Sequence, residues 1–239
     1  MPDFPLTLLL ILAPLTGGLL SFFTTRAFKD PLKFLLAFSG SFLFAICLSG
    51  LLPELYNQGG GKMGIWVLLG FLFQLMMEYF SKGLEHGHLH GKGHHHEQWL
   101  PVYLAMGFHA FMEGIPLGGI HFNSEDTRAG MILGIGIHEL PASFALGILC
   151  QSQVKNKGLR IFYMLLYACF AMGGYSFGAF LGTWENQDWV PRGMAMVTGI
   201  FLHISTTILF ENSENHRYNR IKLIFIVLGS LLGIIVSSL

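Results

Sequence analysis

Long apolar runs alternate with short polar stretches along the whole chain. A helix of about 20 predominantly apolar residues crosses the roughly 30 Å hydrocarbon core of a bilayer. Eight apolar runs long enough to do so occur at 6–23, 32–56, 63–84, 99–121, 128–150, 159–184, 190–212 and 221–239. The pattern predicts an all-α polytopic membrane protein with eight transmembrane helices.

The composition agrees with a protein that lies mostly in lipid. Of the 239 residues, 52% are hydrophobic and 12% are charged, and the mean hydropathy is +0.55. Ordinary soluble domains carry about 25% charged residues. No connection between the runs is long enough for a separate soluble domain, so we predict a single transmembrane domain over residues 1–239. The first run is preceded by Asp3 and by no Lys or Arg, which favours a retained helix over a secretory signal.

The positively charged residues predict on which side of the membrane each loop lies. Of the 14 Lys and Arg residues, eleven fall on one face of the predicted bundle and three on the other. Cytoplasmic loops carry such an excess, so both termini are predicted to be extracellular or periplasmic. A formal net charge of +0 argues against a nucleic-acid partner and leaves the lipid bilayer as the predicted surroundings. The eleven residues are Arg26, Lys29, Lys33, Lys82, Lys92, Lys155, Lys157, Arg160, Arg217, Arg220 and Lys222.

Four ionisable residues lie deep inside the fourth and fifth predicted helices: His109, Glu113, His138 and Glu139. His109 and Glu113 are four positions apart, so they share one face of a helix. Each histidine lies ten residues into its helix, which corresponds to about 15 Å, or half the hydrocarbon thickness. We therefore expect the group near the membrane midplane.

Ionisable side chains at that depth need a common explanation. Each costs at least about 2.5–3.5 kcal/mol to insert, so isolated examples are rare. A single buried histidine is most simply a hydrogen-bonded packing residue, but two imidazoles and two carboxylates together form a donor set that suits zinc. The sequence thus predicts a metal site.

Prolines and glycines flank the predicted site. Pro116 and Pro141 cannot donate hydrogen bonds to the carbonyls of Met112 and Ile137, which would free these oxygens as further ligands. Small residues also permit close packing of helices in lipid. The glycines concerned are Gly107, Gly114, Gly118, Gly134 and Gly136.

The motifs HAFMEGIPLG (109–118) and HELPASFALG (138–147) resemble the fourth and fifth helices of the ZIP family of divalent-metal transporters. Similar matches are SGLLPEL (49–55), the His-rich segment after the third helix, and GIFLHISTTILFE (199–211). The resemblance implies eight helices in a 3+2+3 inverted-repeat arrangement and inward transport of metal across a cell membrane. It also implies that the ligands come from His109, Glu113 and the 138–141 motif.

The chain departs from the family pattern at two positions beside these ligands. Members often have Asn after the helix-four His, where this chain has Ala110, and His or Glu after the helix-five Pro, where it has Ala142. Members with a second metal site also use a carboxylate from helix six, but the run 159–184 contains none. A binuclear centre is therefore not expected.

The predicted centre holds one ion, bound by His109, Glu113 and His138, with Glu139 or water as the fourth ligand. Zn²⁺ is the expected transported ion, and the same donors also admit Fe²⁺, Mn²⁺, Co²⁺ or Cd²⁺. Whether transport is passive or coupled, and whether the chain forms a homodimer, stays open at this point.

Other polar residues are candidates for the path or gate of the ion. Glu54 is placed at the outer end of the second helix, and Glu78 and Glu211 towards the inner ends of the third and seventh. Carboxylates at helix ends are usually solvated or paired with lysine. His203, near the middle of the seventh helix, is the better candidate.

The segment 85–98 is a predicted cytoplasmic loop that is too polar and too rich in glycine for a helix in lipid. Clustered imidazoles bind zinc weakly and exchangeably, whereas the alternative is a solvated linker of biased composition. The histidines of this possible metal-binding loop are His86, His88, His90, His94, His95 and His96.

Two other functions are alternatives to transport. A membrane-embedded zinc hydrolase would use the ligands to activate water, but HELPA (138–142) is not HExxH, because its fifth residue is Ala142 and the following residue is Ser143 rather than His. We therefore expect no enzyme activity. A metal-responsive sensor or regulator without flux is the principal alternative, since Ala142 removes a ligand.

Overall fold

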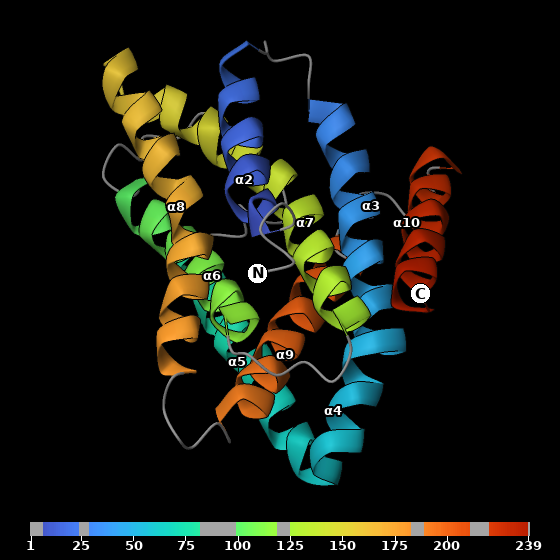
Figure 1. The fold of residues 1–239 in the computed structure, drawn as a ribbon. Helices are drawn as coiled ribbons and strands as arrows, with labels where there is room; N and C mark the ends of the chain where they lie inside the picture. The colour runs from blue at the N-terminus through green and yellow to red at the C-terminus, as the bar shows by residue number, and fades with distance from the viewer. Residues whose placement is uncertain are drawn as a thin grey trace.

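The computed structural model describes residues 7–23, 29–81, 99–118, 125–182, 189–210 and 220–238. Every regular element within these ranges is a helix, and each predicted apolar run coincides with at least one (Figure 1). In chain order the helices are α2 (Leu9–Leu20), η1 (Ser21–Phe23), α3 (Lys29–Ile46), η3 (Cys47–Leu51), α4 (Leu52–Gly59), η4 (Gly60–Lys62), α5 (Met63–Ser81), α6 (Trp99–Gly118), α7 (Glu125–Gln153), α8 (Lys157–Leu181), α9 (Trp189–Phe210) and α10 (Arg220–Ser238).

Five helical stretches among the described residues are long and apolar enough to cross a membrane. The first of them includes α3, α4 and α5, and the positive φ of Gly60 (61°) lies between α4 and α5, where an L side chain would be strained. The helix α6 is not among the five, since its own ionisable residues lower its hydropathy. The five stretches are Leu32–Phe80, Arg128–Gln153, Lys157–Leu181, Trp189–Phe210 and Arg220–Ser237.

The outer surface of the bundle is apolar. In α10 only 11% of the apolar window is buried, and side chains such as Ile224 and Leu228 are about half exposed. Figure 1 shows this helix at the edge of the molecule beside α3. Continuous apolar exposure of this kind is unfavourable in water and favourable against lipid. The chain is therefore a multi-pass membrane protein.

The helices pack mainly in four pairs: α6 with α8, α3 with α10, α5 with α9, and α2 with α7. The helix α7 also packs on α3, so it lies between α2 and α3 in the interior of the bundle (Figure 1). Weaker contacts join α2 to α8, α3 to α9, and α6 to both α7 and α9. The two helices that carry the predicted ligands, α6 and α7, thus lie in contact with each other.

Glycines bring the backbones of α6 and α8 into direct contact. A Cβ added to Gly114 would fall on the Ala171 carbonyl oxygen, and one added to Gly174 would fall on the Phe111 carbonyl oxygen. Such an approach is possible only without a side chain. The predicted role of Gly114 in close packing is confirmed.

The other glycines predicted to permit close packing also lie against neighbouring helices. The position of a Cβ on Gly118 overlaps the Tyr175 carbonyl oxygen of α8, and Gly107 lies against the Phe170 ring. In α7, Gly134 and Gly136 lie against side chains of α3 and α2 rather than against backbone. Of these five glycines, Gly114 and Gly118 of α6 therefore approach a neighbouring backbone more closely than the two glycines of α7 do.

Proline affects the helices that contain it in different ways. Both α6 and α7 continue through Pro116 and Pro141 as single α-helices. Between α3 and α4 the helix widens to a five-residue π-helix, Cys47–Leu51, two residues before Pro53. Such a bulge re-forms the hydrogen bonds around a residue that lacks an N–H.

Candidate metal centre

His109 and Glu113 form a close pair on α6. The His109 Nε2 atom lies 3.0 Å from Glu113 Oε1, and the two side chains are 5% and 0% exposed. Residues at i and i+4 lie one above the other on a helix, so this contact follows from their spacing. An imidazole nitrogen and a carboxylate are thus held together within the protein interior.

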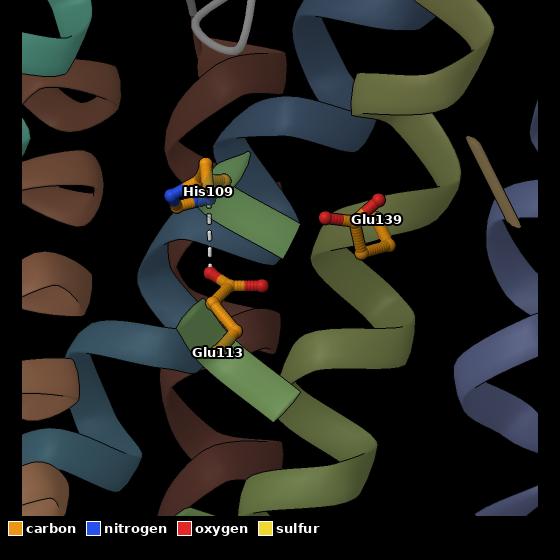
Figure 2. A group of neighbouring side chains, drawn as sticks. All are labelled: His109, Glu113 and Glu139. Carbon is orange, nitrogen blue, oxygen red and sulfur yellow. Dashed lines mark ion pairs between the residues drawn. The ribbon is translucent and has the colours of Figure 1, made fainter. Parts of the chain in front are cut away.

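Glu139 approaches this pair from α7. Figure 2 shows its carboxylate extending from α7 toward the α6 residues. One ligand atom each from His109, Glu113 and Glu139 can be chosen so that all three lie within 4.8 Å of one another. A tetrahedral zinc ion with bonds of about 2.0–2.1 Å has ligand atoms about 3.4 Å apart, so modest movements would complete the coordination.

His138 lies beside the three-residue group rather than within it. Its ring is fully buried and nearly perpendicular to the His109 ring, with centroids 6.2 Å apart and an interplanar angle of 86°. Adjacent residues of an α-helix point about 100° apart, so His138 and Glu139 cannot both face one point directly. In this conformation α7 presents Glu139.

Tyr167 of α8 contacts the group from a third helix. Its hydroxyl donates a hydrogen bond of 3.0 Å to Glu139 Oε2, and the side chain is 1% exposed. The residue was absent from the predicted site. Its signal in the sequence is a phenolic hydroxyl inside an apolar helix, because such a group needs a partner when buried.

Other oxygens of the group accept no hydrogen bond from the described residues. These are Oε1 of Glu139 and Oε2 of Glu113, both buried. Leaving a buried acceptor without a donor costs about 1–3 kcal/mol, and more for a charged group. Two neighbouring carboxylates also repel each other when ionised, and a divalent cation between them removes both costs. A bound cation therefore explains these two buried carboxylates better than side-chain packing alone does.

Two residues close in sequence to these polar groups are buried alanines. Ala110 follows His109 and Ala142 follows Pro141, and both belong to the hydrophobic core. A methyl group supplies no ligand atom. Within the described ranges, one compact set of donors from three residues meets at this place.

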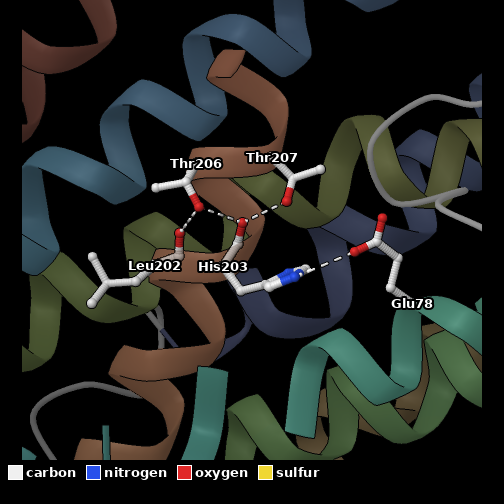
Figure 3. A network of polar contacts seen from close by, with 5 residues as sticks. All are labelled: Glu78, Leu202, His203, Thr206 and Thr207. Carbon is white, nitrogen blue, oxygen red and sulfur yellow. Dashed lines mark hydrogen bonds and ion pairs between the residues drawn. The ribbon is translucent and has the colours of Figure 1, made fainter. Parts of the chain in front are cut away.

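A second polar pair joins α5 to α9. His203 Nε2 lies 3.4 Å from Glu78 Oε2, and the Phe71 ring meets the His203 ring edge-on at 4.8 Å between centroids. Figure 3 shows that the hydroxyls of Thr206 and Thr207 donate to the His203 carbonyl. Two of the predicted path residues are thus in contact.

The remaining predicted path and loop residues are placed as follows. Glu54 lies in the first turn of α4, where its Oε1 accepts a hydrogen bond of 3.1 Å from Gln58 Nε2. Outside the described residues lie Glu211, His86, His88, His90, His94, His95 and His96.

The chain matches a known protein family. The sequence model of a family described as ZIP zinc transporter matches residues 99–238, which is more than half of the chain. The match includes α6 to α10, and so all residues of the three-residue group and Tyr167. No curated protein matches the chain.

Proposed function

Since the chain belongs to the ZIP zinc-transporter family, we propose that it carries a divalent transition metal, zinc in the first place, across a membrane into the cytoplasm. The family is one of divalent-metal transporters, and the proposal adds the ion, the direction and the site. The observation that carries it is the buried group of His109, Glu113 and Glu139. Its nitrogen and oxygen donors suit zinc and also admit iron, manganese, cobalt and cadmium.

The proposed site uses His109, Glu113 and Glu139 as three protein ligands. Three ligands leave a position of a four-coordinate ion for water or for a further group, which suits an ion that must leave again. His138, whose ring lies edge-on to His109, is the nearest candidate for that position after a change of rotamer. We propose that the ion is bound by the three-residue group and exchanged through this fourth position.

We propose further that the eight predicted helices form two inverted halves around α6 and α7. The packing partners support this arrangement. The two halves would correspond if α2 were exchanged with α8, α3 with α9, α5 with α10, and α6 with α7. Under this exchange the packed pair α2–α7 becomes the packed pair α8–α6. The packed pair α3–α10 likewise becomes the packed pair α9–α5. The contacts of α2 with α8 and of α3 with α9 are unchanged by the exchange. In transporters with such pseudosymmetry the substrate site lies at the interface of the two halves, which supports the site proposed on α6 and α7.

The charge distribution supports a membrane orientation with both termini outside, in which α5 and α9 end on the cytoplasmic side. Glu78 lies three residues before the end of α5, and His203 lies seven residues before the end of α9. We propose that this pair lines the cytoplasmic half of the path. Glu54, close to the turn between α4 and α5, then lies at the external entrance.

The test is zinc uptake into proteoliposomes that contain the purified protein and a trapped zinc-sensitive dye. Wild-type protein is expected to give saturable uptake, and His109→Ala is expected to abolish it while the protein stays folded. Ser39→Ala is the matched control, because its buried hydroxyl only bonds the Leu36 carbonyl oxygen within α3. Zinc binding without flux in the wild type would favour a sensor, and saturable flux unaffected by His109→Ala would refute the proposed site.

A further inference from the structure

We propose that Tyr167 is a positioning residue that sets metal selectivity, because its hydroxyl restricts Glu139 to a single coordinating oxygen. This inference rests on the proposed function, since it assumes that the ion enters the group of His109, Glu113 and Glu139. It adds a residue from α8 that supplies no ligand atom and still decides how one ligand binds.

The two oxygens of the Glu139 carboxylate have different surroundings. Oε2 accepts the hydrogen bond of 3.0 Å from the Tyr167 hydroxyl. Oε1 is buried and accepts no hydrogen bond from the described residues. The Tyr167 hydroxyl occupies a lone pair of Oε2 and competes with a metal ion for the electron density of this oxygen, so an ion that bound both oxygens would weaken the hydrogen bond. Binding through Oε1 alone keeps the hydrogen bond.

The Tyr167 side chain has little freedom to give up this bond. It is 1% exposed, and its ring packs against the rings of Tyr103 at 6.2 Å and Phe170 at 6.4 Å between centroids. The backbone of α8 is also fixed against α6 at Gly114 and Gly174, where the helices touch without side chains. The hydroxyl is therefore held at one point relative to the α6 ligands.

The number of carboxylate oxygens that reach the ion matters for its identity. Zinc prefers four ligands in a tetrahedron, with single donor atoms from each residue. Ions such as manganese prefer six ligands with a large share of oxygen, and a bidentate carboxylate helps to provide them. Limiting Glu139 to one oxygen keeps the protein ligands at three atoms and favours zinc.

The experiment compares Tyr167→Phe with Tyr103→Phe in the full-length protein. Both changes remove one hydroxyl from the same aromatic cluster, but the Tyr103 hydroxyl donates to the Tyr163 carbonyl oxygen at 2.8 Å instead of to Glu139. We measure kcat/KM for Mn²⁺ and Zn²⁺ uptake separately. Tyr167→Phe is expected to raise the manganese-to-zinc ratio about tenfold, the scale of one hydrogen bond to a charged group. The Tyr103→Phe ratio is expected to stay at the wild-type value.

X-ray absorption of the zinc-loaded protein measures the number of atoms bound to zinc, which a loss of packing alone would not change. The number of oxygen and nitrogen neighbours is expected to be four in the wild type and in Tyr103→Phe, and five in Tyr167→Phe. An unchanged ratio and an unchanged number in Tyr167→Phe would overturn the inference. So would an equal shift of the ratio in both variants, since the cause would then be the cluster and not the hydrogen bond.

The wild type also tests the inference if Tyr167→Phe does not fold. The infrared difference spectrum on zinc binding, with Glu139→Gln as the reference for assignment, distinguishes a carboxylate bound through one oxygen from one bound through two. A bidentate Glu139 in the wild type contradicts the inference. The proposed function fails separately, through absence of His109-dependent flux. In that case competition of Mn²⁺ with Zn²⁺ for binding in detergent replaces the flux ratio and decides the role of Tyr167.

Discussion

His109 and Glu113 face each other one helical turn apart on α6, with 3.0 Å between Nε2 and Oε1. This contact comes from a single helix, so it does not depend on how neighbouring helices are rotated. The third member of the group, Glu139, comes from α7 and does depend on it. The centre therefore has one part fixed by local geometry and another fixed by helix packing.

Glu113→Gln is expected to weaken zinc binding at least 100-fold. The amide has almost the volume of the carboxylate, but it lacks the charge and the anionic oxygens. Loss of groups that merely support a ligand already lowers metal affinity about 10–100-fold, so loss of a ligand is expected to cost more. Competition with a chelator of known affinity measures the change, and Ser39→Ala is again the control. Wild-type affinity in Glu113→Gln would exclude this residue as a ligand.

Glu139→Gln and His138→Ala separate the two possible ligands of α7. Because the structure groups Glu139 with the α6 pair and leaves His138 beside it, Glu139→Gln is expected to reduce zinc affinity more than His138→Ala does. The zinc affinity of Glu139→Gln is expected to be at least about tenfold lower than that of His138→Ala, because loss of a direct ligand costs more than loss of a group that supports one. Equilibrium binding of both variants in the same detergent checks it. The reverse order would show that α7 turns His138 toward the ion.

Glu78→Gln is expected to lower the maximal rate of zinc uptake while the affinity of the centre stays the same. Glu78 pairs with His203 at 3.4 Å, outside the three-residue group, so its charge bears on the passage of the ion rather than on its capture. The measurement is uptake at saturating zinc together with equilibrium binding. A fall in binding affinity without a change in rate would contradict the path assignment.

Gly174→Ala is expected to destabilise the protein by about 1–3 kcal/mol, the usual cost of adding a methyl group to a filled space. Its Cβ would fall on the Phe111 carbonyl oxygen. Gly173→Ala is the matched control, since its Cβ would make ordinary contact with the Phe111 ring at 3.7 Å. Thermal unfolding in detergent compares the two. Equal melting temperatures would show that α6 and α8 can separate without cost.

Two introduced cysteines test the proposed orientation in a background without Cys47, Cys150 and Cys169. Gly61→Cys, where nothing lies within 4 Å of the added Cβ, is expected to react from outside intact cells with a membrane-impermeant maleimide. Lys155→Cys, between α7 and α8, is expected to react only after the membrane is opened. Labelling of Lys155→Cys in intact cells would reverse the orientation.

The sequence predicted the helices well because each is marked by a long apolar run. The contact of His109 with Glu113 was also predictable, since it needs only the pitch of a helix. The sequence could not say whether His138 or Glu139 faces this pair, because the two are adjacent and the rotation of α7 decides between them. That rotation depends on contacts with α2, α3, α6, α8 and α10.

Contacts between helices that are distant in the sequence were the hardest feature to predict. Tyr167 and Glu139 are 28 positions apart, and their hydrogen bond depends on how α8 packs beside α7. Glu78 and His203 were each selected as path residues, yet nothing in their spacing indicated that they meet. Each single residue was conspicuous as a polar group in an apolar helix, but its partner was set by the packing of the bundle.

The glycine contact between α6 and α8 has a mechanical consequence. Helices that touch backbone to backbone cannot slide or tilt past each other without collision, so α6 and α8 must shift as one rigid body. His109, Glu113 and Tyr167 belong to this body, whereas Glu139 belongs to α7. The hydrogen bond from Tyr167 to Glu139 therefore joins the α6–α8 unit to α7, so any separation of α7 from that unit has to break it.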